Sequence, residues 1–510
     1  MAEEERTFSE PAVHPKEAAP GSIAARGEPA ANGSGKSSTS LPGNLPARRA
    51  AAPDGACFVT NARGEAALEQ LATTDSQVPT TISHDHGYGA RRTISAAIRG
   101  AQDGAVITIA AGVYQEDLIL DRDVTLVADG AVELSPLDGP AIHVRSGQAT
   151  VHGLTVREPR PDHAAVVVSG GRLVLRDCDV IGGGVRVGDS AVVELAGGRV
   201  QGCVGPAVAA RGDATVRLAG CVLRDIDGSA IAVSQTATVE ATGVVVLRAT
   251  GAAADVTGGA MILTDCELAE SGAGILADGR AVVKVHDSRL RDLSTDAVHT
   301  AGEATVELTG TVISRCGGAG VTGNAAGTIV LDDCRIEAVG SSGAAAQGTA
   351  KLNVTGCSIT HPGGFGVYAA ESASVDIVDS EIRDCARTAV HFAGTVHAWI
   401  HGGKIVGTPE HGIRLTGSAI LRLDGGTAVE AAGMTGLQIE GEADATVRGL
   451  IVEGANIGIR VQDTPHHPLF EACEVRRTVL AGIEAAAETS PTFRACVVEP
   501  GSSWETGPRP

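Results

Sequence analysis

DAVHTAGEATVELTGTVISRCGG, residues 296–318, is the first of five consecutive segments of 23 residues that follow one pattern without a gap. The next two are AGVTGNAAGTIVLDDCRIEAVGS (319–341) and SGAAAQGTAKLNVTGCSITHPGG (342–364), and the pattern continues to residue 410. Val, Ile and Leu dominate the third, eleventh, thirteenth and eighteenth positions, and Gly, Asp, Asn and Ser separate three short alternating runs. A fixed period of this length indicates a solenoid, in which each segment forms one turn of the chain.

The three alternating runs predict three short strands in every turn, so that the stacked turns form three parallel sheets. Similar segments extend upstream to about residue 140 and downstream to about residue 500, which gives about sixteen turns. The fold class is therefore all-β. The cysteines within the repeats, such as Cys334 and Cys357, are expected to form a ladder of small side chains inside the solenoid.

Upstream of the repeats, TISAAIRGAQDGAVITIAAGVYQEDLILDRDVTLVADG (93–130) begins with a helical pattern and continues with two strand-like runs. Ile94, Ala97, Ile98 and Ala101 share one stripe of a helix over 93–101, and alternation predicts strands over 105–114 and 117–130. A capping element is required because an open solenoid end exposes apolar core and unpaired strand edges.

This segment resembles the N-terminal cap and first coil of right-handed parallel β-helix proteins of the pectate-lyase and pectin-esterase superfamily. The repeats resemble the generic β-helix repeats of copper-protein maturation factors of the NosD type. The resemblance implies a single-stranded right-handed parallel β-helix with a helical cap. It does not extend to the superfamily's catalytic motifs: GVYQE (112–116) is a general cap feature that many β-helices share, and Asp332-Asp333 and Glu410-His411-Gly412 are only faint echoes of such motifs on different turns.

These patterns divide the chain into five regions. Residues 1–56, rich in Ala, Pro, Gly, Ser and Glu, are predicted to be a disordered tail. Residues 57–92 are predicted to be a linker with little structure, 93–139 the cap and first coils, 140–500 the solenoid, and 501–510 a C-terminal tail.

Composition excludes several classes of function. The net charge of −21 disfavours nucleic-acid binding, and the chain has no apolar run of 18 residues to span a membrane. The opening MAEEERTFSE lacks the basic and apolar regions of a secretory signal, so a cytoplasmic location is expected. Eleven cysteines without a CxxC pair predict neither a disulfide framework nor a zinc site, and no cofactor is expected.

Function is sought in the outward columns, because a position repeated in every turn forms one stripe on the surface. The fourth position carries small or unremarkable residues in the middle of the chain and then five large polar or aromatic ones in succession. The twelfth position adds a second group on the neighbouring sheet. The residues predicted to contact a ligand are Tyr368, Asp376, His391, Trp399, Arg414, Arg422, Gln438 and Arg460.

Three interpretations of this stripe remain open: a solvated polar face, a ligand groove, or a catalytic groove. In the groove, Tyr368 or Trp399 would stack on the ligand, and Arg414 and Arg460 would bind an anion. In the catalytic version, His391 is the general acid or base, with Tyr368 and Arg414 beside it. A metal site is disfavoured because four residues of extended strand, from His397 to His401, span about 13 Å.

Two functional hypotheses follow. The first is an intracellular binding or scaffold protein that presents this surface to a carbohydrate, a peptide or a protein partner. The chain has no phosphate-binding loop of its own, and the resemblance implies an ATPase encoded separately as one such partner. The alternative is an enzyme of the lyase, epimerase or hydrolase type that acts on a carbohydrate or peptide at the same surface.

Overall fold

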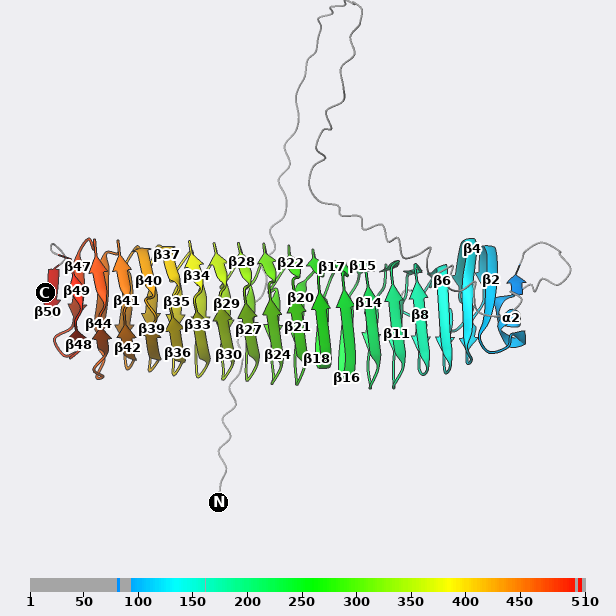
Figure 1. The fold of residues 1–510 in the computed structure, drawn as a ribbon, viewed down its shortest axis with the longest axis horizontal. Helices are drawn as coiled ribbons and strands as arrows, with labels where there is room; N and C mark the ends of the chain where they lie inside the picture. The colour runs from blue at the N-terminus through cyan, green and yellow to red at the C-terminus, as the bar shows by residue number, and fades with distance from the viewer. Residues whose placement is uncertain (1–79, 83–92, 161, 500–502, 507–510) are drawn as a thin grey trace, which may run out of the picture. The chain divides into compact units, whose positions relative to one another are not determined.

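The computed structural model describes residues 80–82, 93–160, 162–499 and 503–506, and the predicted tail over 1–56 lies outside them. The described residues fall in one compact unit, Asp75–Pro510. They form a right-handed parallel β-solenoid of about 17 turns, with one short helix near its N-terminal end (Figure 1). None of the helices in this described part is long and apolar enough to cross a membrane.

From residue 273 onward each turn contributes three strands, and each strand pairs in parallel with the strand three places further along the chain. The turn quoted first consists of β23 (Val298–Thr300), β24 (Thr305–Thr309) and β25 (Val312–Ser314). These strands pair with β26 (Val321–Gly323), β27 (Thr328–Asp332) and β28 (Arg335–Glu337), respectively. The predicted three parallel sheets are therefore confirmed.

Sheet one contains the strand that opens each turn. Its other strands are β3 (Leu118–Leu120), β5 (Ile142–Val144), β7 (Ala164–Val168), β10 (Gly184–Val187), β13 (Val208–Ala210), β20 (Ala273–Ala277), β29 (Ala344–Ala346), β32 (Val367–Ala369), β35 (Val390–Phe392), β38 (Ile413–Leu415), β41 (Thr435–Glu440), β44 (Ile457–Gln462), β47 (Ala481–Ala485) and β50 (Ser503–Thr506).

Sheets two and three contain the second and third strands of each turn. In sheet two these are β8 (Arg172–Arg176), β11 (Val192–Ala196), β14 (Thr215–Ala219), β21 (Val282–His286), β30 (Lys351–Thr355), β33 (Ser374–Val378), β36 (His397–His401), β39 (Ile420–Asp424), β42 (Asp444–Arg448), β45 (Leu469–Glu471) and β48 (Thr492–Arg494). In sheet three they are β9 (Asp179–Ile181), β12 (Arg199–Gln201), β15 (Val222–Ile226), β17 (Val245–Ala249), β19 (Glu267–Ala269), β22 (Arg289–Arg291), β31 (Ser358–Thr360), β34 (Glu381–Arg383), β37 (Lys404–Thr408), β40 (Ala428–Ala432), β43 (Ile451–Glu453), β46 (Glu474–Arg476) and β49 (Val497–Val498). The long strands β6 (Gln148–Arg157), β16 (Ile231–Thr242) and β18 (Ala252–Thr264) each run through two sheets.

The interior is a column of aliphatic side chains at the predicted positions. In the turn quoted first, Val298, Val306, Leu308 and Ile313 are completely buried. The described repeat cysteines are free, and most are buried, as the sequence predicted. In some turns a serine takes the position of the cysteine. The Ser380 hydroxyl, one turn after Cys357, accepts a hydrogen bond from the Cys357 backbone nitrogen at 3.1 Å. This ladder of small side chains supplies partners to backbone groups inside the solenoid.

The corner between sheets two and three carries a left-handed residue, and from Asp287 to Gly402 Asp and Gly alternate there. Asp333 (φ 50°) is followed one turn later by Gly356 (φ 60°) and then by Asp379 (φ 44°). A Cβ atom on Gly356 would lie 2.6 Å from the Asp333 carboxylate oxygen. Glycine is therefore needed at this corner both for its backbone conformation and for the room that it leaves to the aspartate above it.

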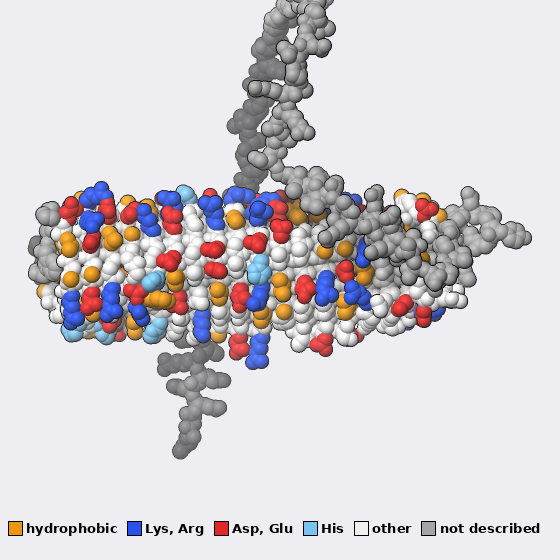
Figure 2. Space-filling view, in the orientation of Figure 1, with side chains coloured by type: hydrophobic (Ala, Val, Ile, Leu, Met, Phe, Trp, Pro, Cys, Tyr) orange, Lys and Arg blue, Asp and Glu red, His pale blue; other side chains and the backbone are white. Residues whose placement is uncertain are grey.

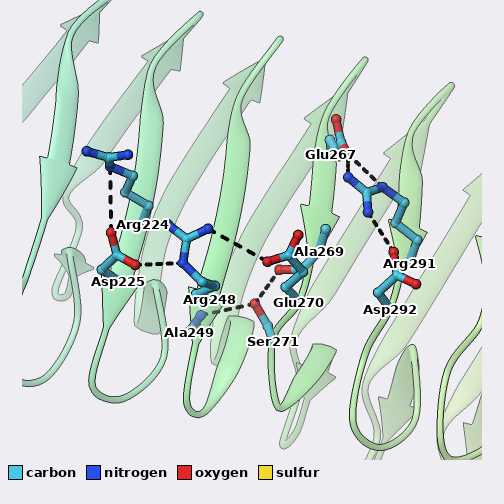
Figure 3. A network of polar contacts seen from close by, with 10 residues as sticks. All are labelled: Arg224, Asp225, Arg248, Ala249, Glu267, Ala269, Glu270, Ser271, Arg291 and Asp292. Carbon is cyan, nitrogen blue, oxygen red and sulfur yellow. Dashed lines mark hydrogen bonds and ion pairs between the residues drawn. The ribbon is translucent and has the colours of Figure 1, made fainter. Parts of the chain in front are cut away.

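Ion pairs connect successive turns along sheet three. In Figure 3, Arg248 pairs with Asp225 at 2.7 Å and with Glu270 at 3.7 Å, and Arg291 pairs with Glu267 at 2.5 Å. Figure 2 shows basic and acidic side chains intermingled on the visible face of the solenoid. The mixed charges of sheet three therefore neutralise one another locally.

The N-terminal cap agrees with the predicted helix. Helix α2 (Ile94–Gly100) has Thr93 as its N-cap, and the Glu116 carboxylate accepts hydrogen bonds from the Ile94 and Ser95 nitrogens, both at 2.8 Å. These acceptors satisfy backbone donors that a helix leaves unpaired at its first turn. The sequence did not predict the contribution of Glu116.

Three boundaries differ from the prediction. After β2 (Ala105–Gln115), the single strand expected over 117–130 is two strands, β3 and β4 (Val124–Ser135), because the chain turns a corner at residues 121–123. A short strand, β1 (Thr80–Ile82), lies within the predicted linker and pairs with β2. The last strand, β50, lies within the predicted C-terminal tail and pairs with β47.

Candidate functional site

The predicted outward stripe exists as one column on sheet one. The backbone register places Tyr368 beside His391, His391 beside Arg414, Arg414 beside Gln438, and Gln438 beside Arg460. Their immediate neighbours along each strand, such as Val367 and Ala369, are buried in the solenoid. The side chains of the column therefore point away from the core, and adjacent members lie about 4.8 Å apart at the backbone.

An aromatic cluster forms the N-terminal end of this stripe. Phe365 stacks on Tyr368 with ring centroids 5.2 Å apart, and His391 packs edge-on against Tyr368 at 5.7 Å. The Arg387 guanidinium lies 4.7 Å from the centre of the Phe365 ring. Sequence reasoning missed Phe365 and Arg387, although a Phe directly before a sheet-one strand was a signal in so aromatic-poor a chain. Stacking holds these rings in a fixed arrangement.

His391 is neutral at physiological pH. Burial, followed by the nearby Arg414 cation, lowers the pKa of His391 to about 4. The pKa of His411 is lowered as well, for the same two leading reasons. The argument that His391 titrates near neutrality as a general acid or base is therefore wrong, because desolvation disfavours the charged imidazolium.

Both arginines of the stripe are already paired with carboxylates. The Nε atom of Arg414 donates to Glu440 at 2.7 Å, and Arg460 pairs with Glu484 at 2.8 Å. Glu440 lies two residues after Gln438 on β41 and therefore shares its outward side. The predicted role of Arg414 and Arg460 as anion binders is weakened, because each guanidinium already has an anionic partner.

Gln438 points outward but is buried, with only 2% of its surface exposed. Its neighbours in register are the long side chains of Arg414 and Arg460. The Gln438 amide nitrogen donates to the Gln462 side-chain oxygen at 3.3 Å, whereas its own Oε1 has no partner within the described residues. An exposed position was expected from strand alternation, which does not account for the length of flanking side chains.

Unpaired buried atoms gather around this part of sheet one. Among the described residues, five buried side-chain N or O atoms have no hydrogen-bond partner. Four of them belong to three successive turns: Nδ1 of His391, Nδ1 of His411, Oγ1 of Thr435 and Oε1 of Gln438. A buried polar atom without a partner costs about 1–3 kcal/mol, so such a concentration marks either strain or a binding surface.

The remaining predicted residues lie on sheet two in a separate group. The Asp424 carboxylate accepts hydrogen bonds from Trp399 Nε1 at 3.3 Å and Arg422 Nε at 3.1 Å, and lies 2.5 Å from His401 Nδ1. These bonds, that of His401 first, lower the pKa of Asp424. Asp376 adjoins Trp399 in register. We call Trp399, His401, Arg422 and Asp424 the sheet-two cluster. The structure therefore divides the predicted ligand contacts between two faces.

No set of three or more His, Cys, Asp or Glu side chains in the described ranges is arranged to hold a metal ion. The imidazoles of the predicted stripe instead contact hydroxyl and aromatic groups. His391 Nε2 lies 3.3 Å from the Thr416 hydroxyl, and the His391 ring lies 5.3 Å from Phe365. The chemistry that the stripe offers is hydrogen bonding by neutral groups beside an aromatic surface.

Comparison with known proteins identifies the fold. A family model described as a right handed beta helix region matches residues 273–419 and 388–503. No curated protein matches the chain.

Among solved structures, the tailspike protein 3 of bacteriophage CBA120 is 13% identical with a TM-score of 0.37, and the match covers 70% of this chain and 58% of the tailspike. The chain thus spans little more than half of that protein. The A-module of a mannuronan C-5 epimerase from Azotobacter vinelandii is 12% identical with a TM-score of 0.28, covering 81% of this chain and 94% of the module. A pectate lyase is 12% identical with a TM-score of 0.24, covering 66% of this chain and 78% of the lyase. The repeats and the three parallel sheets show that the chain folds as a right-handed parallel β-helix, and the family model matches part of that solenoid.

Proposed function

We propose that this protein binds an uncharged carbohydrate on sheet one. The binding surface, called here the sheet-one patch, consists of Phe365, Tyr368, His391, His411 and Gln438. The observation that carries the proposal is the group of buried, unpaired polar atoms beside a stacked aromatic pair. Sugars match such a surface, because their C–H faces pack on aromatic rings while their hydroxyls both donate and accept hydrogen bonds.

The charges of the patch favour an uncharged ligand over an acidic polymer. Arg414 and Arg460 are paired with Glu440 and Glu484, and the two histidines are neutral at pH 7. The whole chain carries a net charge of −21, which repels polyanions at long range. A peptide or protein partner, and a cytoplasmic location, stay predictions from the sequence.

A binding role is better supported than catalysis. A general acid or base works best when its pKa lies near the working pH, whereas burial holds the pKa of His391 at about 4. The carboxylate of Glu440 on the same face is engaged by Arg414. The groups of the patch are suited to holding a ligand, and the lyase, epimerase or hydrolase alternative has no comparable observation in its favour.

The test is calorimetric titration of the full chain with cello- and malto-oligosaccharides, and with oligo-uronates as charged comparators. We expect an uncharged series to bind and Tyr368→Ala to weaken binding at least about tenfold, because the stacking surface is lost. The matched control is Trp399→Ala, which removes an aromatic ring from sheet two and should leave the affinity unchanged. Absence of binding by every series, or loss of binding only in the Trp399 variant, would overturn the proposal.

A further inference from the structure

A second histidine arrangement lies in the same outward column, three turns before Tyr368. The register leads from His299 through Thr322 and Ala345 to Tyr368. At about 4.8 Å per turn, His299 and Tyr368 are roughly 14 Å apart along the sheet. Because Thr and Ala are short, the two larger side chains bound a low stretch of the surface between them.

His299 is held from both sides by polar side chains. Its Nδ1 lies 3.5 Å from the Asp296 carboxylate, and its Nε2 lies 3.4 Å from the Asn324 amide nitrogen. The Asp296 carboxylate is itself fixed, because its other oxygen accepts a hydrogen bond from the Ala319 backbone nitrogen at 2.7 Å. With the Nδ1 proton directed at Asp296, Nε2 is left as an acceptor that the Asn324 amide reaches.

His299 and His391, which lies one turn beyond Tyr368, follow the same pairing rule. His299 contacts Asn324, a side chain of the next turn that lies two residues past its register partner Thr322. His391 contacts Thr416, which lies two residues past its partner Arg414. Both histidines therefore stand in the same column and are held by a polar side chain of the following turn.

We propose that Asp296, His299 and Asn324 form a second subsite of the carbohydrate surface. A linear, uncharged oligosaccharide that packs on Tyr368 would cross Ala345 and Thr322 along the direction in which the turns stack. Its hydroxyls would then reach the Asn324 amide at the N-terminal end, where the imidazole of His299, whose two nitrogens already have partners, holds that amide in place. This inference rests on the proposed function, and it adds the length and direction of the ligand.

The experiment is calorimetric titration of the full chain with cello-oligosaccharides from the disaccharide to the hexasaccharide. In the native protein, we expect affinity to increase with length until the chain reaches His299. In His299→Ala, the affinity for the hexasaccharide should fall about tenfold, as expected for one lost hydrogen-bonding group, while that for the disaccharide stays the same. Asn324→Ala should reproduce the length-dependent loss of affinity. Agreement between the two variants would show that the loss does not come from a folding defect in His299→Ala alone.

His361→Ala is the matched control. His361 also faces an aspartate, Asp384, at 3.7 Å, and its left-handed backbone (φ 52°) matches that of Ala338 (φ 53°). This variant should bind every length as the native protein does. Tyr368-dependent binding that does not vary with length, or an equal loss at all lengths in His299→Ala, would refute the second subsite alone. Absence of binding at every length would refute the proposed function and this extension together.

Discussion

The sheet-one patch and the sheet-two cluster are built from similar side chains and differ in how those side chains are bonded. Each has an aromatic ring, histidine and a neighbouring arginine–carboxylate pair on adjacent turns. In the sheet-two cluster, the indole, imidazole and guanidinium all meet at Asp424. In the sheet-one patch, Nδ1 of His391 and Oε1 of Gln438 are buried and have no partner among the residues that the structure describes. Under the proposed function, the comparison teaches that the hydrogen-bond partners of the side chains distinguish a binding surface from a structural cluster where composition does not.

The largest expected effect is on stability at sheet two. Asp424→Ala would leave the Trp399, His401 and Arg422 donors without their shared acceptor. We expect unfolding free energy to fall by about 2 kcal/mol, with oligosaccharide affinity unchanged. Urea unfolding of both proteins measures the first quantity and calorimetry the second. An unchanged urea midpoint would show that the cluster does not contribute to stability, and a loss of affinity would place the ligand on sheet two.

The two faces should also differ in the pH range over which their titratable groups contribute to stability. The folded pKa of His391 is about 4, below its ordinary value of 6.5, so the unfolded chain takes up the proton first. Its contribution to stability is fully present above pH 6.5 and is lost as pH falls from 6.5 to about 4, by about 1–2 kcal/mol after allowance for partial exposure. The folded pKa of Asp424 is lowered from 3.8, so the contribution of Asp424 is lost only at still lower pH.

The measurement is the unfolding free energy of the native protein and of His391→Gln at several pH values from 7 to about 4.5. The unfolding free energy of the native protein should fall relative to that of His391→Gln as the pH decreases across this window, because only the native chain has this imidazole, which is protonated in the unfolded state before it is protonated in the folded state. Asp424→Asn serves as the comparison and should follow the native pH profile over the same range. Parallel profiles for the native protein and His391→Gln would contradict the burial of a neutral histidine.

A smaller effect of opposite sign is expected at Gln438. Gln438→Leu replaces an amide whose buried oxygen has no partner with an apolar group of similar size. We expect unfolding free energy to rise by about 1 kcal/mol while oligosaccharide affinity falls. Thermal unfolding and calorimetry on the same variant give both values. A variant that is less stable, or that binds as well as the native protein, would show that Gln438 has a structural role only.

The smallest effect is expected for Trp399→Phe, which keeps the ring but removes the indole donor to Asp424. Unfolding free energy should fall by about 0.5–1 kcal/mol, because His401 and Arg422 still satisfy the carboxylate. Oligosaccharide affinity should not change. A reduced affinity in this conservative variant would show that the ligand contacts both faces.

The sequence was sufficient to predict the solenoid because its period places one residue of every turn in the same column. The inward Val298, Val306, Leu308 and Ile313 follow directly from alternation, and so does the outward stripe. The bonding of the stripe depends on contacts between turns, which periodicity does not encode. The pairing of Arg414 with Glu440 is one such contact.

Other features of the site depend on the size of neighbouring side chains. Gln438 is outward by alternation, yet it lies buried between two arginines. Trp399 was grouped with Tyr368 because their turns are adjacent and their sheets are neighbours, whereas the side-chain contacts of Trp399 are to residues of sheet two. The neutral state of His391 follows from burial in three dimensions, so its ordinary solution pKa was misleading.

The central claim is that sheet one, and not sheet two, contacts the ligand. Its most direct test is nitrogen-15 NMR of the imidazole groups during titration of the full chain with cellohexaose. The account predicts that the signals of His391 and His411 move, because their unpaired Nδ1 atoms gain partners, while the signal of His401 stays in place. Movement of the His401 signal with no change at His391 and His411 would contradict it.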